Sequence, residues 1–266
     1  MEKITVIDER QNTVVKSNVL VQEARYSLSV VQQRILLYLI SKITPGSTEF
    51  APIELNVLEF CEIAGIKGKK YAAIKEEVKK LADSSFWIES QGKEVLKRWI
   101  NSETPPQIIQ RSGTITLCLS NSLREYLLEL RSHFTQYQLE WVLAFKRKYS
   151  IRLYEYLCSR HYNTLEPYVF QITLANLKEV LGTEEHYSRF NKFNEKVLQP
   201  AAAEINEFSD KKIIYKPIKK GTTVVSIEFT VIHKEALEAL ETEHRINKKL
   251  GLPDGQLTLW EEISSR

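Results

Sequence analysis

The sequence predicts a helix-rich α+β protein in which one small unit occurs twice. Two segments, IELNVLEFCEIAG (53–65) and FQITLANLKEVLG (170–182), overlay at a constant offset of 117 residues. Each is followed by a short polar linker, a second amphipathic pattern with helical spacing, and β-type sequence around a glycine. Helix, helix, glycine turn, helix and hairpin is the order of a winged helix-turn-helix. We therefore expect two tandem winged helix-turn-helix domains of related topology.

Each element of the unit has its own sequence signal. A strong helix opens each unit, and Ser29 and Ser150 are suited to cap these two helices at their N-termini. Gly65 and Gly182 end the next helix, where the turn requires a positive φ or a close approach of helices. The expected elements are opening helices at 29–43 and 150–161, second helices at 53–65 and 170–182, and hairpins that join 85–90 to 95–100 and 211–218 to 222–232.

A long amphipathic segment, 122–148, is expected to be a helix that links the two units, with the boundary near Ser132. This gives an N-terminal domain at 1–131, a C-terminal domain at 132–240 and a tail at 241–266. The alternative is two unrelated small α+β domains whose amphipathic helices resemble each other only in general pattern.

The composition excludes several classes of protein. At 266 residues, with 43% apolar and 27% charged residues, the chain suits two ordinary domains. Its N-terminus lacks the apolar core of a signal peptide, and no apolar run approaches the roughly 18 residues that span a bilayer. We therefore expect a cytoplasmic protein with no membrane partner. Cys61, Cys118 and Cys158 fit neither a disulfide framework nor a zinc site, which favours reduced packing residues.

No pattern of catalytic residues is present. The five histidines lie at least eleven positions apart, so none forms the pair that a metal-dependent nickase of single-stranded DNA requires. The segment GIKGKK (65–70) lacks the glycine spacing of a phosphate loop and the Ser or Thr after its lysine. We expect no catalytic residue, no metal and no cofactor.

The helix expected at 188–208 carries two parallel rows. Its apolar stripe includes Phe190 and Phe193, and a basic and amide row lies one position earlier, rotated by roughly 100°. Arginine pairs with guanine and asparagine or glutamine with adenine in the major groove. Pro200 predicts a kink or a fresh helix start. The alternative is ordinary solvation of a surface helix. The candidate DNA contacts on this helix are Ser188, Arg189, Asn191, Lys192, Asn194, Lys196 and Gln199.

Positive charge is concentrated around this helix. Residues 187–220 contain eight Lys or Arg against four acids, although the net charge of the whole chain is only +3. The second hairpin ends in lysines suited to phosphates beside the groove. The equivalent helix of the first unit contains Glu76 and Glu77, which repel phosphate, so its unit is expected to contact mainly the DNA backbone. The remaining candidate DNA contacts are Lys216, Lys219 and Lys220 in the second unit, and Lys67, Lys69 and Lys70 in the first.

Three segments in this order resemble the iteron-type plasmid replication initiators: SNVLVQEARYSLSVVQQRILLYLIS (17–41), YSIRLYEYL (149–157) and FNKFNEKVLQPAAAEIN (190–206). The resemblance spans roughly 17–240. It implies monomers that bind direct repeats at a plasmid origin, help to open the adjacent duplex and recruit the replicative helicase and the host initiator. It also implies dimers, joined through the first domain, that repress the protein's own gene at an inverted repeat. Individual base contacts do not transfer.

A pentapeptide in the tail, QLTLW (256–260), is similar to the bacterial sliding-clamp-binding motif. In such a peptide Leu257, Leu259 and Trp260 would fill an apolar cleft while Gln256 forms a hydrogen bond at its rim. Tryptophan replaces the commoner phenylalanine. The alternative is that these apolar side chains fold back onto the second domain.

Two functions remain from different classes. The favoured one is a plasmid replication initiator, and the alternative is a winged-helix transcriptional repressor without a replication role. Both predict double-stranded DNA as the partner of residues 189–199, so affinity for DNA does not separate them.

Overall fold

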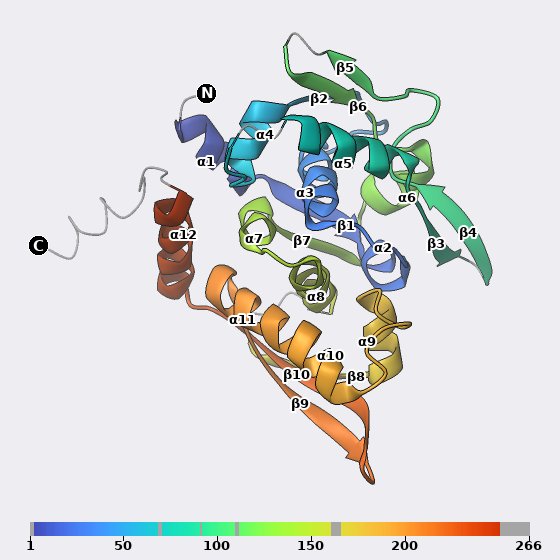
Figure 1. Ribbon diagram of the computed structural model, residues 1–266, viewed down its shortest axis with the longest axis vertical. Helices are drawn as coiled ribbons and strands as arrows, with labels where there is room; N and C mark the ends of the chain where they lie inside the picture. The colour runs from blue at the N-terminus through green and yellow to red at the C-terminus, as the bar shows by residue number, and fades with distance from the viewer. Residues whose placement is uncertain (1–2, 69–70, 91, 110–111, 161–165, 251–266) are drawn as a thin grey trace, which may run out of the picture.

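The computed structural model describes residues 3–68, 71–90, 92–109, 112–160 and 166–250. The first unit forms the upper part of the molecule in Figure 1 and the second unit the lower part, and their helices meet along α3, α7 and α8. Helix α12 runs from the second unit back along the side of the molecule toward α1.

The first unit is the larger. Its elements are α1 (Lys3–Gln11), β1 (Thr13–Ser17), α2 (Asn18–Glu23), α3 (Val30–Ser41), β2 (Ile53–Asn56), α4 (Val57–Ile63), α5 (Tyr71–Asp83), β3 (Ser85–Ser90), β4 (Lys93–Arg98), β5 (Gln107–Ile109), β6 (Thr114–Leu117), the 3-10 helix η1 (Asn121–Leu123), α6 (Arg124–Leu127), β7 (Phe134–Gln138) and α7 (Leu139–Ala144).

The second unit is more compact in sequence. Its elements are α8 (Lys148–Ser159), β8 (Tyr168–Thr173), α9 (Leu174–Val180), α10 (Phe190–Phe193), the π-helix η2 (Asn194–Leu198), α11 (Gln199–Phe208), β9 (Lys211–Lys220), β10 (Thr223–His233) and α12 (Ala236–Leu250).

The repeat predicted from the sequence is confirmed in the sheets. The second unit has strand order β8-β10-β9 and the first has β2-β6-β5, both antiparallel. Leu55 and Ile172, which the overlay matches, occupy equivalent positions, because Leu55 pairs with Ile115 and Ile172 pairs with Ile227. Both winged-helix units therefore share a sheet register as well as a helix order.

Two details of that prediction are wrong. Segments 53–65 and 170–182 are not helical throughout: each begins as a strand, and Asn56 and Thr173 then cap α4 and α9 by accepting backbone N–H groups. The hairpin predicted around Gly92 does form, as β3 and β4, but it lies outside the sheet of the first unit. In the first unit the pair β5–β6 is equivalent to the β9–β10 hairpin, which is the wing of the second unit. The β3–β4 hairpin is therefore an insertion after α5.

The predicted linker helix at 122–148 is also wrong. The segment breaks into η1, α6, β7 and α7, and two of its residues, Glu129 and His133, have positive φ values of 51° and 53° that no helix accommodates. Strand β7 pairs along its whole length with β1, so pairing with a distant segment overrides the local helical pattern.

The two predicted serine caps have different outcomes. Ser29 caps α3 in a capping box: its side chain accepts the backbone N–H of Gln32, whose side chain accepts that of Ser29. Ser150 does not cap α8, which begins at Lys148; its hydroxyl lies buried and donates to Glu204.

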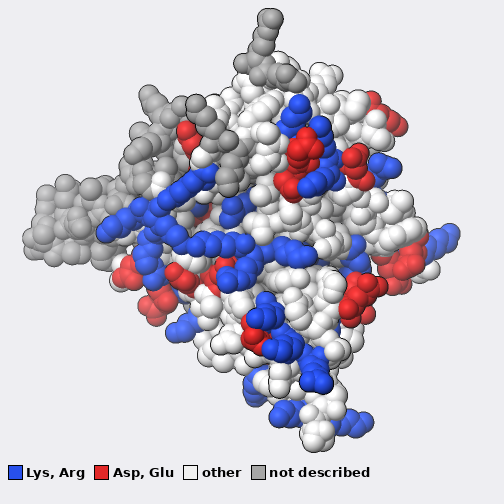
Figure 2. Space-filling model, viewed as in Figure 1, with Lys and Arg blue, Asp and Glu red and all other residues white. Residues whose placement is uncertain are grey.

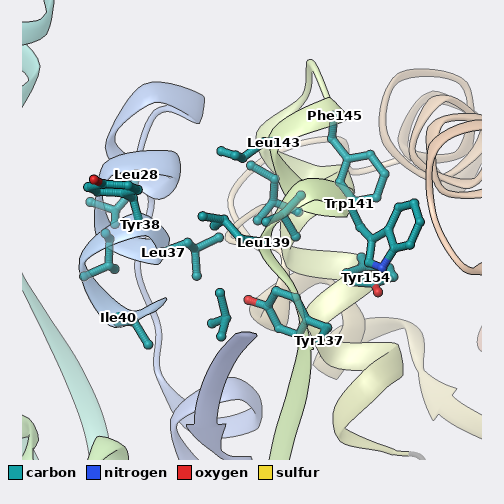
Figure 3. Close-up of a cluster of buried hydrophobic side chains, with 14 of the residues drawn as sticks. Leu28, Leu37, Tyr38, Ile40, Tyr137, Leu139, Trp141, Leu143, Phe145 and Tyr154 are labelled. Carbon is teal, nitrogen blue, oxygen red and sulfur yellow. The ribbon is translucent and has the colours of Figure 1, made fainter. Parts of the chain in front are cut away.

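One continuous apolar core joins the two units (Figure 3). Leu37 of α3 faces side chains of β7 and α7, and behind these lies Tyr154 of α8. The Tyr154 ring packs edge-on against Tyr137 and Phe145, with ring centroids 5.4 and 5.6 Å apart. Because interiors of this kind are close-packed, the two units do not slide freely past each other.

Buried arginines add polar connections across the same joint. Arg152 of α8 is 3% exposed and donates to the carbonyls of Ala24 in the first unit and Val180 in the second, at 3.2 Å each. Its guanidinium also lies 4.2 Å from the centre of the Tyr26 ring. Arg34 of α3 donates to the Phe145 carbonyl at 2.6 Å. These contacts hold the units in one relative orientation.

Cys61, Cys118 and Cys158 are buried and form no disulfide, as expected of packing residues. Within the described ranges, no helix is long and apolar enough to cross a membrane.

Candidate nucleic-acid interface

The helix predicted at 188–208 exists, with an irregular centre. It begins at Phe190 rather than at Ser188, and Arg189, in an extended backbone conformation, occupies the N-cap position. It runs through the π-turn η2 into α11, and the backbone N–H of Gln199 donates to the carbonyl of Asn194, five residues earlier. Pro200 has no N–H to donate, so the wide turn directly before it is the irregularity that the sequence predicts there.

The apolar stripe of this helix is buried. Phe193, Val197 and Ile205 are at most 1% exposed, and Phe190 at the open end is half-buried. The stripe packs on α8 and β9, which belong to the same unit. The prediction that these aromatic residues face the core is confirmed.

The basic row faces solvent. Arg189, Lys192, Lys196 and Gln199 are all exposed. Between the lysines, Glu195 forms ion pairs with Lys196 at 2.8 Å and with Lys192 at 2.9 Å. These hydrogen bonds and charges lower the pKa of Glu195 to about 2. The row therefore keeps a positive surplus, which one carboxylate partly offsets.

Among the amide residues of the helix, Asn194 has a different environment. It is half-buried, and its carboxamide oxygen accepts a hydrogen bond of 2.6 Å from the hydroxyl of Tyr215 on β9. Asn194 thus links the helix to the β9–β10 hairpin, the wing of its own unit. Ser188 and Asn191 are exposed beside the row.

The lysines of the wing occupy two different places. Lys219 and Lys220 are exposed at the tip of the β9–β10 hairpin. Lys216 lies on the sheet face opposite to the one that Tyr215 presents to the helix, and its ammonium pairs with Glu228 at 2.7 Å. The structure therefore places Lys219 and Lys220, but not Lys216, at the tip of the β9–β10 hairpin.

The corresponding helix of the first unit carries balanced charge. Lys79 and Lys80 of α5 pair with Glu76 and Glu77, one turn earlier, at 2.8 and 3.1 Å. Glu77 also accepts a hydrogen bond of 2.6 Å from Ser29, which fixes α5 to the start of α3. In the turn before α5 the predicted Lys67 is exposed, whereas Lys69 and Lys70 lie outside the described residues.

The face of the molecule drawn in Figure 2 carries charged groups of both units. Basic and acidic side chains mix over α5 in the upper part, basic ones dominate over α10 in the lower part, and a band of Lys and Arg crosses the middle between them. The sequence did not predict this central band.

The clamp-binding residues Gln256, Leu257, Leu259 and Trp260 lie outside the described residues. Among the residues that the structure describes, no group of three or more His, Cys, Asp or Glu side chains is placed to hold a metal ion.

Comparison with known proteins gives matches in the same two units. A replication initiation protein of Escherichia coli is 31% identical over 126 residues, which make up 45% of this chain and 37% of that protein. The crystal structure of the Pi initiator protein in complex with iteron DNA matches with a TM-score of 0.71 at 19% identity, over 85% of this chain and 99% of that one. The family model for the first winged helix of the initiator replication proteins matches residues 13–158, and the model for their second winged helix matches residues 173–231. The chain therefore belongs to the initiator replication protein family.

Proposed function

We propose that this protein initiates plasmid replication by binding direct repeats, or iterons, at the origin. The observation that carries the proposal is the exposed row at Arg189, Lys192, Lys196 and Gln199, on a helix whose opposite side is fixed in the core. A helix supported in this way presents base-reading and phosphate-binding side chains together. The structurally similar Pi initiator was crystallised with iteron DNA, which supports the same class of ligand here.

The two units divide the work. The second unit, within the C-terminal domain expected at 132–240, reads bases through Arg189, Asn191 and Gln199, and Lys219 and Lys220 at the tip of its β9–β10 hairpin bind phosphates. The N-terminal domain (1–131) contacts the backbone through the turn that contains Lys67, because α5 neutralises its own lysines. The shared core fixes the separation of the two helices, which suits a repeat of about 20 base pairs, roughly two helical turns.

Further roles complete the proposal. Dimers joined through the first domain repress the protein's own gene at an inverted repeat, and the origin-bound monomer recruits the replicative helicase and the host initiator. The chain acts in the cytoplasm, where the plasmid lies, and contributes binding and DNA distortion rather than catalysis.

The decisive experiment supplies the protein in trans to a plasmid that carries the DNA flanking its gene, including any direct repeats, but no initiator gene. An initiator maintains this plasmid, and the Arg189→Ala variant loses most of that ability. A repressor without a replication role binds the same DNA and lowers transcription but does not support replication. Maintenance independent of the protein would refute the proposal.

The tail offers a separate test of partner binding. We expect a synthetic peptide of residues 252–264 to bind the bacterial sliding clamp, because Leu257, Leu259 and Trp260 suit an apolar cleft. The matched control carries Gln256→Ala and Trp260→Ala. Equal clamp binding by both peptides would exclude this role.

A further inference from the structure

The loop between α7 and α8 carries basic side chains that belong neither to the helix at 190–208 nor to the β9–β10 hairpin. Lys146 and Arg147 are exposed and Lys148 is half-buried, at the point where the chain passes from the first unit to the second. The loop belongs to the middle of the molecule, where Figure 2 shows a band of Lys and Arg between the groups over α5 and α10.

A buried carboxylate fixes this loop beside the helix formed by α10, η2 and α11 (Phe190–Phe208), here called the reading helix. Glu204 of α11 is 5% exposed and accepts the backbone N–H groups of Lys146 and Arg147 at 3.2 Å each. It also accepts the hydroxyl of Ser150 at 2.6 Å and the guanidinium of Arg147 at 2.5 Å. A carboxylate that meets two backbone donors and two side chains is an anchor for the loop, which is therefore held in one position.

The loop is fixed to the first unit as well. The Phe145 carbonyl accepts the Arg34 guanidinium of α3, and the Lys148 ammonium donates to the Ser27 hydroxyl at 3.0 Å. These contacts place the loop at the joint of the two units. Of the three cationic side chains here, Arg147 pairs with Glu204 and Lys148 donates to Ser27. Lys146 uses only its backbone in these contacts, so its ammonium is available to a ligand.

Geometry indicates what that ligand is. If both units place a helix in the major groove of one duplex, the joint between them faces the sugar–phosphate backbone that separates the two grooves. We propose that the α7–α8 loop binds DNA phosphates between the two reading sites, with Lys146 as the main contact and Glu204 as the residue that positions the loop. This inference rests on the proposed DNA binding and adds a third, central contact to it.

The test uses the full-length protein with Lys146→Gln, and Lys212→Gln as the matched control. Lys212 is also exposed but lies on the sheet face opposite to α10, paired across the strands with Ile232. The probe is a duplex that carries one direct repeat from the origin, prepared with ordinary phosphates or with uncharged methylphosphonates at its central positions. Binding is measured over a range of salt concentrations.

We expect Lys146→Gln to weaken binding to the ordinary duplex about 3- to 10-fold and to reduce the slope of log K against log salt by about 0.9, the value for one phosphate contact. Lys212→Gln changes neither quantity. With methylphosphonates at the centre, wild type and Lys146→Gln bind equally. Equal binding of these two proteins to the ordinary duplex would overturn the loop assignment alone, whereas wild-type protein with no preference for the repeat would overturn the proposed function.

Discussion

The two winged-helix units place a helix at the same point of the same topology and give it different chemistry. On α5 of the first unit, Lys79 and Lys80 each have their own glutamate one turn earlier. On the second unit's helix, Lys192 and Lys196 share the single carboxylate of Glu195, and Arg189 forms no ion pair within the described ranges. The scaffold thus fixes where a helix can meet DNA, and the pairing of its surface charges decides how strongly it binds.

Helix α5 and the reading helix also differ in the element to which each is hydrogen-bonded. Helix α5 is tied to α3 through the hydrogen bond between Ser29 and Glu77, which is directed into its own unit. The reading helix is tied to the wing through Tyr215 and Asn194, so the helix and the hairpin beside it form one rigid surface. A pre-organised surface of this kind loses less conformational entropy when it binds a ligand.

The two units should differ most in their contribution to DNA affinity when the lysines of their helices are replaced by glutamates. We expect Lys192→Glu with Lys196→Glu to weaken binding to the repeat duplex by roughly two orders of magnitude at low salt, and to reduce the salt slope by about 1.8, because two phosphate contacts are lost. The matched pair, Lys79→Glu with Lys80→Glu, should change affinity only a few-fold. Titrations of one duplex by both variants test this, and equal losses would contradict the division between the units.

Sequence specificity should depend on the second unit alone. Replacing Arg189 by Ala should cost about 1–3 kcal/mol on the repeat and relax specificity, because a bidentate guanine contact disappears. Lys219→Ala removes a phosphate contact instead, so it should weaken repeat and scrambled duplexes alike and reduce the salt slope by about one. Competition binding with both duplexes distinguishes the two effects. Unchanged discrimination in Arg189→Ala would remove Arg189 from the reading set.

The sequence predicts the second unit better than the first for a physical reason. In residues 170–233 the β9–β10 hairpin follows directly after α11, so helical periodicity, strand alternation and the turn glycine are enough to indicate helix and wing in the right order. The long-range strand pair is common to both units, β8 with β10 and β2 with β6, but in the first unit the β3–β4 insertion lies between α5 and the strands β5 and β6. Local patterns do not show which hairpin joins the sheet, and for the same reason they predict β7, which pairs with the distant β1, as part of a helix.

The candidate site shows the same limit. Helical periodicity was sufficient to place Arg189, Lys192 and Lys196 outside and the phenylalanines inside. It gave no sign that Asn194 would bond to Tyr215, because that contact joins two elements. It likewise missed the basic loop at the joint, whose position depends on the buried Glu204.

The turn glycines allow the units to be compared in stability. Gly182 has φ of 62°, and a Cβ there would lie 3.1 Å from the backbone carbonyl oxygen of Tyr26; Gly65 has φ of 64°, and its Cβ would meet only the end of the Leu250 side chain. Alanine at positive φ costs about 1–2 kcal/mol in itself. We expect Gly182→Ala to lower the free energy of unfolding by about 2 kcal/mol and Gly65→Ala by about 1, since Leu250 can rotate away but a carbonyl cannot. Urea unfolding of both variants measures this, and a larger cost at Gly65 would contradict it.

The smallest expected effect concerns Glu195 on the second unit's helix and Glu76 at the equivalent position of α5. Hydrogen bonds and charges of Lys196 and Lys192 lower the pKa of Glu195 to about 2, so Glu195 is ionised at neutral pH and repels phosphate. Glu195→Gln should therefore strengthen binding to any duplex about two- to fivefold and reduce the preference for the repeat, since the added attraction is independent of sequence. Glu76→Gln, the equivalent change on α5, leaves Lys80 paired with Glu77 and should have a smaller effect. Were Glu76→Gln to strengthen binding as much as Glu195→Gln, α5 would lie as close to the phosphates as the reading helix, and the first unit would have to share the recognition of the repeat.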